Sequence, residues 1–395
     1  MRQLWMFIFQ GMFVSVCSLI DTAFGNGISM DSICVLSAYT VITWITYCTY
    51  SVGVYGYRTL LSNVRSCFLV EIVVALMVSI VVIAFSKWIP FIYSLTEYQN
   101  HLFSECLVAH GVSIIFLAMG EFLYNYVQLK YKNTLIWWSN IVFYTIMFLL
   151  DWLVVKNNLE LNYIVYATGI SYVLYDVILL IFSGILKEKD SITLMGIKEC
   201  FKHGGRILLD RLLGKVATVV FNIYASKLGT ELYAIHSICY SLSTNTENIT
   251  NACYNFQIVR LSEKASTEEK YKVMDQLGKK YYWKVSIIST CFCCILMLFI
   301  HGGINLSKLL LYVFIYASQA WMIQLYENHR AFLTSIKETR CLMFGGLFGI
   351  LVRIPITLVS YYSGLGLIGF GFAPGIDFLV RGIYLKLCSK NILQK

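Results

Sequence analysis

Two aspartates stand inside apolar runs that are long enough to cross a membrane. Asp21 lies in the run 4–24, and Asp151 lies in the run 135–155. A charge at the bilayer centre costs at least ~2.5 kcal/mol, so an acid there normally faces a cavity, a partner or a proton path. If both runs start at the cytoplasmic face, a rise of ~1.5 Å per residue puts the two acids roughly 25 Å and 24 Å from that face. Two carboxyl groups at one level can take up a proton or hold Na⁺ between them.

The composition predicts an all-α polytopic membrane protein. Of the 395 residues, 58% are hydrophobic and only 13% are charged, and the mean hydropathy is +0.68. Soluble domains carry about 25% charged residues. Apolar runs of roughly 20 residues recur along the whole chain, and each is expected to be a helix because lipid offers the backbone no hydrogen-bond partner. We predict twelve spans at about 4–24, 34–55, 67–85, 106–127, 135–155, 163–186, 207–225, 232–257, 281–300, 309–324, 341–361 and 365–387.

The basic residues predict the orientation of these spans. Of the 31 lysines and arginines, 23 fall on one side of the predicted membrane, which by the positive-inside rule is the cytoplasmic side. Both termini are therefore expected in the cytoplasm, with the protein in the cell membrane. The net charge of +9 is spread over many short loops and does not imply nucleic-acid binding. The thirteen cysteines are scattered through apolar segments and indicate neither disulfides nor a metal site, so no cofactor is expected.

Short matches between the two halves of the chain indicate a tandem repeat. Two matches have an offset of 205, namely 32–34 with 237–239 and 132–134 with 337–339. A third pairs Asp176 with Asp377 at an offset of 201. We therefore expect a six-helix bundle over 1–190 and a second over 191–395, related by a pseudo-twofold axis along the membrane normal. Secondary transporters typically have this arrangement and bind substrate between the halves.

Residues 18–24 read "SLIDTAF", close to the motif "lvDtifvg", and residues 148–155 read "FLLDWLVV", close to the motif "ivLDpllI". In the second half, further motifs are matched at 227–236, 332–340 and 351–355. By the order and spacing of these segments, the chain resembles over nearly its whole length the multidrug and toxic compound extrusion (MATE) family of the MOP flippase superfamily, in which the first two motifs belong to spans one and five. The resemblance implies two six-helix bundles forming a V, with export driven by Na⁺ or H⁺.

The resemblance implies a cation-coupling site in the N-terminal bundle. Family members that couple there carry an acid in span one, an Asn and an acid in span five, and a Thr in span six; Asp21, Asp151 and Thr168 match, whereas Met147 replaces the Asn. Members that couple through the C-terminal bundle carry acids where this chain has Gly214 and Ile323. The N-terminal bundle is therefore the preferred coupling site.

Other polar residues inside the predicted spans are weaker candidates. Asp210, Asp377 and Gln324 are secondary candidates in the C-terminal half, although Asp210 with Arg211 and Lys215 is expected to form a charge cluster at one end of span seven. Arg353 and Arg381 are expected to reach an interface or pair with an acid such as Asp377, and His236 is expected to be packed. Four hydroxyls of span two share one helical face and are expected to line a water-accessible cavity: Tyr39, Thr43, Thr46 and Tyr50.

These features favour a cation-coupled antiporter that exports amphiphilic, cationic small molecules and acts as a monomer in the lipid bilayer. The alternative is a flippase of the same superfamily for a lipid-linked or peptide precursor. An enzyme is disfavoured because no span combines His with Asp or Glu as a catalytic pair, and no Ser, Cys and His arrangement lies on a polar loop. The sequence leaves the substrate and the choice between Na⁺ and H⁺ open.

Overall fold

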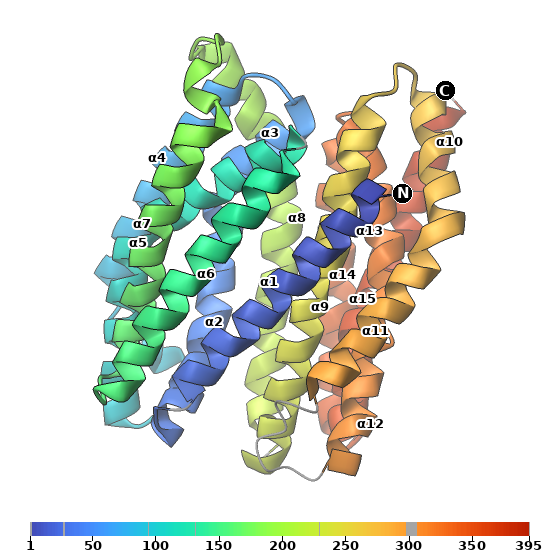
Figure 1. Cartoon of the computed structure of the whole chain (residues 1–395). Coiled ribbons are helices and arrows are strands. Elements are labelled where there is room, and N and C mark those ends of the chain that lie inside the picture. The colour runs from blue at the N-terminus through green and yellow to red at the C-terminus, as the bar shows by residue number, and fades with distance from the viewer. Residues whose placement is uncertain are drawn as a thin grey trace. The chain divides into compact units, whose positions relative to one another are not determined.

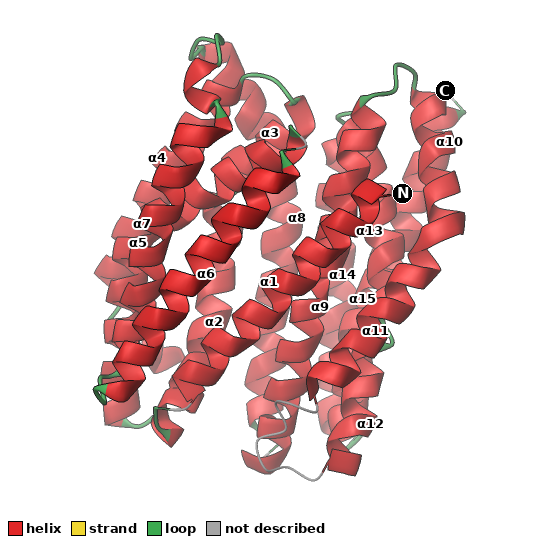
Figure 2. Ribbon diagram, viewed as in Figure 1, coloured by secondary structure: helices red, strands yellow, loops and turns green. Residues whose placement is uncertain are grey.

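The computed structural model describes residues 2–26, 28–93, 95–130, 132–228, 230–297 and 306–394, and these residues are almost entirely helical (Figures 1 and 2). The α-helices are α1 (Arg2–Asn26), α2 (Met30–Tyr50), α3 (Val52–Leu60), α4 (Val64–Phe85), α5 (Glu97–Leu129), α6 (Asn133–Lys156), α7 (Leu161–Ser183), α8 (Leu194–Ser226), α9 (Thr230–Ser262), α10 (Thr267–Leu277), α11 (Trp283–Met297), α12 (Leu306–Ala317), α13 (Ala320–Ser335), α14 (Thr339–Tyr362) and α15 (Gly366–Leu393). Three short helical turns join them: η1 (Ile89–Ile92), η2 (Ile185–Lys187) and η3 (Gly278–Tyr282).

Each of the twelve predicted spans coincides with a helix or with a pair of consecutive helices. The second span is divided into α2 and α3, and the tenth into α12 and α13. The end of the ninth span, 298–300, lies outside the described residues. Helices α5, α8 and α9 have 33 residues each and extend well beyond the predicted limits.

The exposed surface of the helices is apolar where a soluble protein would be polar. Eight helical segments of the described chain are long and apolar enough to cross a bilayer. On α4, the exposed side chains include Leu76, Met77, Ile80 and Val81, with Met77 61% and Ile80 59% exposed. Contiguous apolar faces of this kind are stable only against lipid or a partner. The chain is therefore a multi-pass membrane protein.

The chain divides into two compact units. Unit 1 comprises Met1–Ser18 and Leu209–Lys395, and unit 2 comprises Leu19–Leu208. The division falls within helices α1 and α8, whose residues are shared between the units. The predicted bundles 1–190 and 191–395 and their pseudo-twofold axis stay predictions.

The same helix pairing occurs inside each unit. In unit 2, α5 packs against α2, α4 and α7, and α6 packs against α7. In unit 1, α13 packs against α9, α11 and α15, and α14 packs against α15. In both units, then, the helix of the fourth predicted span of a half touches those of the second, third and sixth, and the fifth touches the sixth. This shared order is what a tandem repeat requires.

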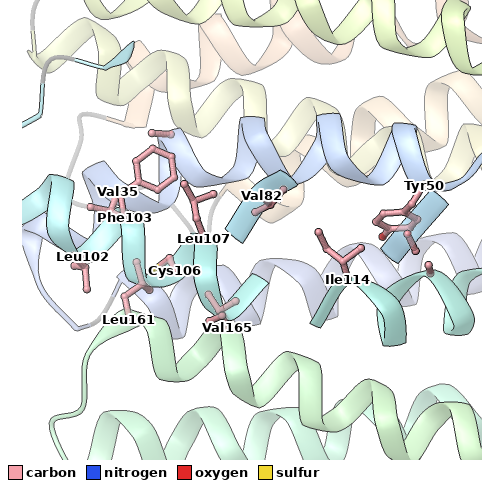
Figure 3. Packing of buried hydrophobic residues seen from close by; sticks show 14 residues of the cluster. Val35, Tyr50, Val82, Leu102, Phe103, Cys106, Leu107, Ile114, Leu161 and Val165 are labelled. Atoms are coloured by element: carbon pink, nitrogen blue, oxygen red, sulfur yellow. The ribbon is translucent and has the colours of Figure 1, made fainter. Parts of the chain in front are cut away.

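Helix α5 forms the centre of the hydrophobic core of unit 2 (Figure 3). Its residues Phe103, Leu107 and Ile114 are fully buried, in one cluster with Leu161 and Val165 of α7. Small residues bring the backbones close together: a Cβ on Gly111 of α5 would collide with Ile83 of α4. Membrane helices commonly pack through such small residues because backbone proximity increases van der Waals contact.

Local chemistry defines the ends of the central helices. Thr96 and Gln99 form a reciprocal capping box at the start of α5, and Gly184 ends α7 in the left-handed conformation with φ 84°.

Beyond α7, Glu188 lies 3.1 Å from the Lys130 ammonium and accepts a hydrogen bond from Tyr126. These two donors hold the pKa of Glu188 below its ordinary value and fasten this segment to the end of α5.

Two adjacent glycines of α14 test the packing of unit 1. A Cβ on Gly346 would lie 2.8 Å from the Asp210 Cα of α8, whereas one on Gly345 would lie 3.5 Å from Leu385. We expect Gly346→Ala to destabilise the protein by about 1–3 kcal/mol through overpacking. Gly345→Ala should leave stability unchanged or raise it, because alanine favours the helix. Thermal denaturation of the two variants in detergent checks this, and equal midpoints would contradict the packing of α14 on α8.

Candidate functional site

The two predicted coupling acids meet inside unit 2. Asp21, near the end of α1, and Asp151 of α6 have directly neighbouring carboxyl groups. Asp151 is 0% exposed, and Asp21 is partly buried. Next to them, the rings of Phe24 and Phe148 lie 6.3 Å apart and pack the end of α1 against α6. Two segments 130 positions apart in the sequence thus place both acids at one point.

The carboxyl pair lacks the partners that normally stabilise buried charge. Both oxygens of Asp151 and Oδ1 of Asp21 are buried without a hydrogen-bond partner. Among the described residues, neither acid takes part in a recorded ion pair. Tyr39 of α2 and Tyr172 of α7 lie close enough to interact electrostatically with Asp21. Since two adjacent carboxylates resist simultaneous ionisation, this arrangement favours a shared proton or a bound cation.

The remaining residues of the implied coupling site do not bond to the pair. Thr168 donates its hydroxyl to the Ile164 carbonyl of its own helix at 3.1 Å. Met147, at the position where the resemblance implies an Asn, is 3% exposed on α6. The assignment of Thr168 to the coupling site stays a prediction.

The hydroxyl stripe of α2 is directed in part toward α5. The Tyr39 ring packs edge-on against His110 of α5 at 5.7 Å, and Thr46 shares a 2.8 Å hydrogen bond with His110 Nε2. Tyr50 belongs to the hydrophobic core of unit 2 (Figure 3). Thr43 is only partly buried, and its hydroxyl donates to the Thr40 carbonyl at 2.8 Å. Whether these residues line a cavity stays a prediction.

Unit 2 contains three further interior acids that the sequence analysis did not select as site residues, of which Glu121 is partly buried and the other two are fully buried. Glu121 of α5 accepts hydrogen bonds from Tyr47 at 2.8 Å and from Asn125 at 2.7 Å. Glu71 of α4 is 0% exposed and accepts from the Val54 amide at 2.9 Å. Asp176 of α7 is also 0% exposed but was noticed only as a marker of the repeat. All three lie within predicted spans, which is the signal that could have identified them.

Unit 1 contains a different arrangement, a chain of alternating buried charges on α8, α13, α14 and α15. Consecutive members lie within ion-pair distance of one another: Arg353 and Asp377 at 3.9 Å, Asp377 and Arg381 at 2.6 Å, Arg381 and Asp210 at 3.5 Å, Asp210 and Arg330 at 3.9 Å, Arg330 and Glu327 at 2.9 Å, and Glu327 and Arg211 at 2.9 Å. Tyr326 also donates a hydrogen bond to Asp210. Each acid of this chain is therefore neutralised by at least one guanidinium group.

These contacts correct the prediction made for Asp210 and confirm the prediction made for Arg353 and Arg381. The expected end-of-helix cluster of Asp210, Arg211 and Lys215 is wrong for Asp210, which is 0% exposed; α8 begins at Leu194, thirteen residues before the predicted start, so Asp210 lies in mid-helix. The pairing of Arg353 and Arg381 with Asp377 is confirmed.

The packed state expected for His236 is also confirmed. The ring is 1% exposed, and its nitrogens share hydrogen bonds with Tyr316 at 2.8 Å and with Asn222 at 2.9 Å. Gln324, the third secondary candidate, is buried on α13 beside the Cys253 thiol. Neither residue takes part in the chain of alternating charges.

The two repeat-related aspartates should differ in their contribution to stability. Asp377→Asn leaves the buried guanidinium group of Arg353 without its recorded counter-charge and removes one of the two acids paired with Arg381, and we expect a loss of about 3–5 kcal/mol. Asp176→Asn removes no ion pair and should leave stability unchanged or higher. Thermal unfolding of the two matched variants in the same detergent checks this, and a larger loss for Asp176→Asn would contradict it.

The predicted cavity face of α2 can be tested with a water-soluble thiol reagent. In a background without reactive native cysteines, Thr43→Cys should be labelled faster than Thr46→Cys, because Thr46 is 5% exposed and bonded to His110. The measurement is the labelling rate of each cysteine in lipid vesicles. Complete protection of both would show that the stripe does not reach water.

Comparison with known proteins gives a consistent fold. No family model matches the chain, and no curated protein matches its sequence. Solved structures match over the whole length. An aspartate-to-asparagine mutant of the Vibrio cholerae MATE transporter VcmN is 12% identical, with a TM-score of 0.79, covering 100% of this chain and 96% of that one.

Two further matches have the same extent. A MOP superfamily transporter from Pyrococcus furiosus, whose binding pocket is described as having reverse polarity, is 12% identical with a TM-score of 0.74. An outward-facing multidrug resistance MATE transporter is 12% identical with a TM-score of 0.75. In both cases the match covers 100% of this chain and 96% of the other. The chain therefore has the fold of the MATE transporters of the MOP superfamily.

Proposed function

We propose that the chain belongs to the MATE family and exports amphiphilic, cationic small molecules in exchange for H⁺ or Na⁺. The observation that carries this proposal is the carboxyl pair of Asp21 and Asp151, which meets inside unit 2 without a counter-charge. The fold supports it, because the matching structures include multidrug resistance MATE transporters in both outward-facing and inward-facing conformations. The chain acts as a monomer in the cell membrane, with both termini in the cytoplasm, and not as an enzyme.

The charge balance of unit 2 supports a cationic coupling ion. Its recorded interior acids are Asp21, Glu71, Glu121, Asp151 and Asp176, whereas Arg58 is the buried cation recorded with them, hydrogen-bonded to Asn125. A low-dielectric interior with excess negative charge attracts a proton, a metal cation or a cationic substrate. The same interior disfavours anions, and nothing in the described residues favours the precursor flippase.

The charges of unit 1 support the assignment of the coupling site to unit 2, because they disfavour cation binding in unit 1. Asp210 and Asp377 each lie within 4.0 Å of two arginines, so a further cation would be repelled there. At Gly214, where the resemblance places an acid in other members, a Cβ would lie 3.1 Å from Arg381 Nη2. The space for a carboxyl group at that point is therefore occupied by a guanidinium group.

Coupling follows from the free energy of the carboxyl pair. Without a bound cation, the two carboxylates repel each other and hold α1 and α6 apart at this point. Binding of H⁺ or Na⁺ neutralises the pair and allows the surrounding helices to repack, which displaces a cationic substrate. Because linkage is reciprocal, substrate binding must weaken cation binding by the same factor.

Transport in liposomes tests this proposal. Purified protein is reconstituted with ethidium as a cationic probe, and a proton gradient and a Na⁺ gradient are imposed separately. Asp151→Asn should lower gradient-driven accumulation about tenfold or more. A change of this size corresponds to the loss of a typical coupling free energy between two ligands. Asp21→Asn should lower it at least in part.

The matched control is Asp275→Asn on α10, which removes an exposed carboxylate paired with Lys279 at 2.6 Å. This variant should transport ethidium like the native protein. The assignment fails if the double variant Asp21→Asn, Asp151→Asn accumulates ethidium against its gradient at the native rate.

A further inference from the structure

Asp176 of α7 is a buried carboxyl group to which the coupling mechanism above assigns no role. Its side chain is 0% exposed, and both of its oxygens are buried without a hydrogen-bond partner. A Cβ on Gly120 of α5 would lie 2.8 Å from Asp176 Oδ1 and 2.7 Å from the Tyr172 ring. The α5 backbone is therefore packed directly over the carboxyl group. An ionised carboxylate in such a place would lose the solvation free energy of water without the compensation of a hydrogen bond or a counter-charge.

The repeat shows how the same carboxyl group is stabilised in the other half. Asp377 of α15 is the counterpart of Asp176, and it is paired with Arg381, four residues later, at 2.6 Å and with Arg353 at 3.9 Å. The residue four positions after Asp176 is Leu180. Arg381, one helical turn after Asp377, neutralises that carboxylate in unit 1. At the corresponding position in unit 2, one turn after Asp176, the side chain of Leu180 is apolar.

Among the described residues, Asp176 takes part in no recorded ion pair. The titratable side chains recorded around the neighbouring Tyr172 and Tyr175 are Asp21, Glu121, Tyr124 and Tyr144, and a cation recorded near them, Arg58, interacts with Tyr124. The nearby cation at the start of α6, Lys132, donates instead to the Ser183 carbonyl, about two helical turns further along α7. With acids and phenols as neighbours, the carboxyl group is favoured in its neutral, protonated form.

Tyr172 connects Asp176 with the carboxyl pair. Its side chain interacts electrostatically with Asp176, with Glu121 and with Asp21. Asp21 in turn is the direct neighbour of Asp151. Tyr172 is therefore a common neighbour of Asp176 and of the carboxyl pair, in a poorly solvated region. In such a region the interaction between charges is much stronger than in water.

We propose that Asp176 is a second proton-binding carboxyl group of unit 2, loaded and unloaded together with the Asp21 and Asp151 pair. This inference rests on the proposed function. A proton from water converts the Asp176 carboxylate to the carboxylic acid, and its return to water restores the carboxylate. A proton suits this position better than a metal cation, because a single enclosed carboxyl group offers two oxygens, whereas a hard metal cation needs more oxygen ligands.

Infrared spectroscopy of the reconstituted protein tests proton binding without a substrate. At neutral pH, the native protein should show the carbonyl stretching band of a buried carboxylic acid, with the isotope shift expected in heavy water. Asp176→Asn should remove one component of this band, and the exposed control Asp275→Asn should remove none. An unchanged band in Asp176→Asn would overturn the proposal, since Asp176 would then be ionised.

Transport separates this inference from the proposed function. Asp176→Asn should lower proton-driven ethidium accumulation several-fold while ethidium–ethidium exchange continues at the native rate, because exchange needs no net proton movement. If Asp176→Asn loses its band component but retains native proton-driven accumulation, the coupled role is wrong. If Asp176→Asn and the double variant of Asp21 and Asp151 both retain native accumulation, the proposed function fails as well.

Discussion

The cost of placing charge in a low-dielectric interior shapes both units of this protein. An ion removed from water loses several kcal/mol of solvation, which is recovered only by a close counter-charge or by hydrogen bonds. Unit 1 recovers it through a chain of alternating arginines and acids, in which each carboxylate has a guanidinium neighbour. Unit 2 leaves Asp151 and Asp176 without either kind of partner. The recorded acids in the chain of alternating charges in unit 1 thus have counter-charges, whereas Asp151 and Asp176 in unit 2 have none.

The two units with this difference share the same order of helix contacts, with α5 at the centre of unit 2 and α13 in the same place in unit 1. Small residues permit the close contacts in both. Gly120 brings α5 onto Asp176, and Gly346 brings α14 onto Asp210. The same order of helix contacts is therefore compatible with different interior charges in the two units.

The position of the carboxyl pair has a mechanical consequence. Asp21 lies in the C-terminal part of α1, which belongs to unit 2 from Leu19 onward. The residues of α1 up to Ser18 belong to unit 1. A change in the contact between Asp21 and Asp151 therefore acts on a helix that is shared by both units. In the proposed mechanism, neutralising the repulsion between the two carboxylates would change how α1 packs against α6, because close-packed interiors transmit strain.

The sequence by itself determined the membrane class, the twelve apolar segments and the two acids of the first and fifth spans. These follow from composition and periodicity, because lipid allows a spanning chain few structures other than helices. Helix limits were predicted less well, and Asp210 was misplaced because α8 starts at Leu194 in a polar stretch that hydropathy does not recognise.

Only the tertiary structure decided which charges have partners. Asp176 and Asp377 look equivalent in the sequence, yet one is unpartnered and the other is held by two arginines, Arg381 on its own helix and Arg353 on α14. The pairing of Asp210 with Arg330 and Arg381 likewise joins helices more than a hundred residues apart. Such contacts depend on which faces of the helices meet, and helical periodicity alone does not specify the partner of a face.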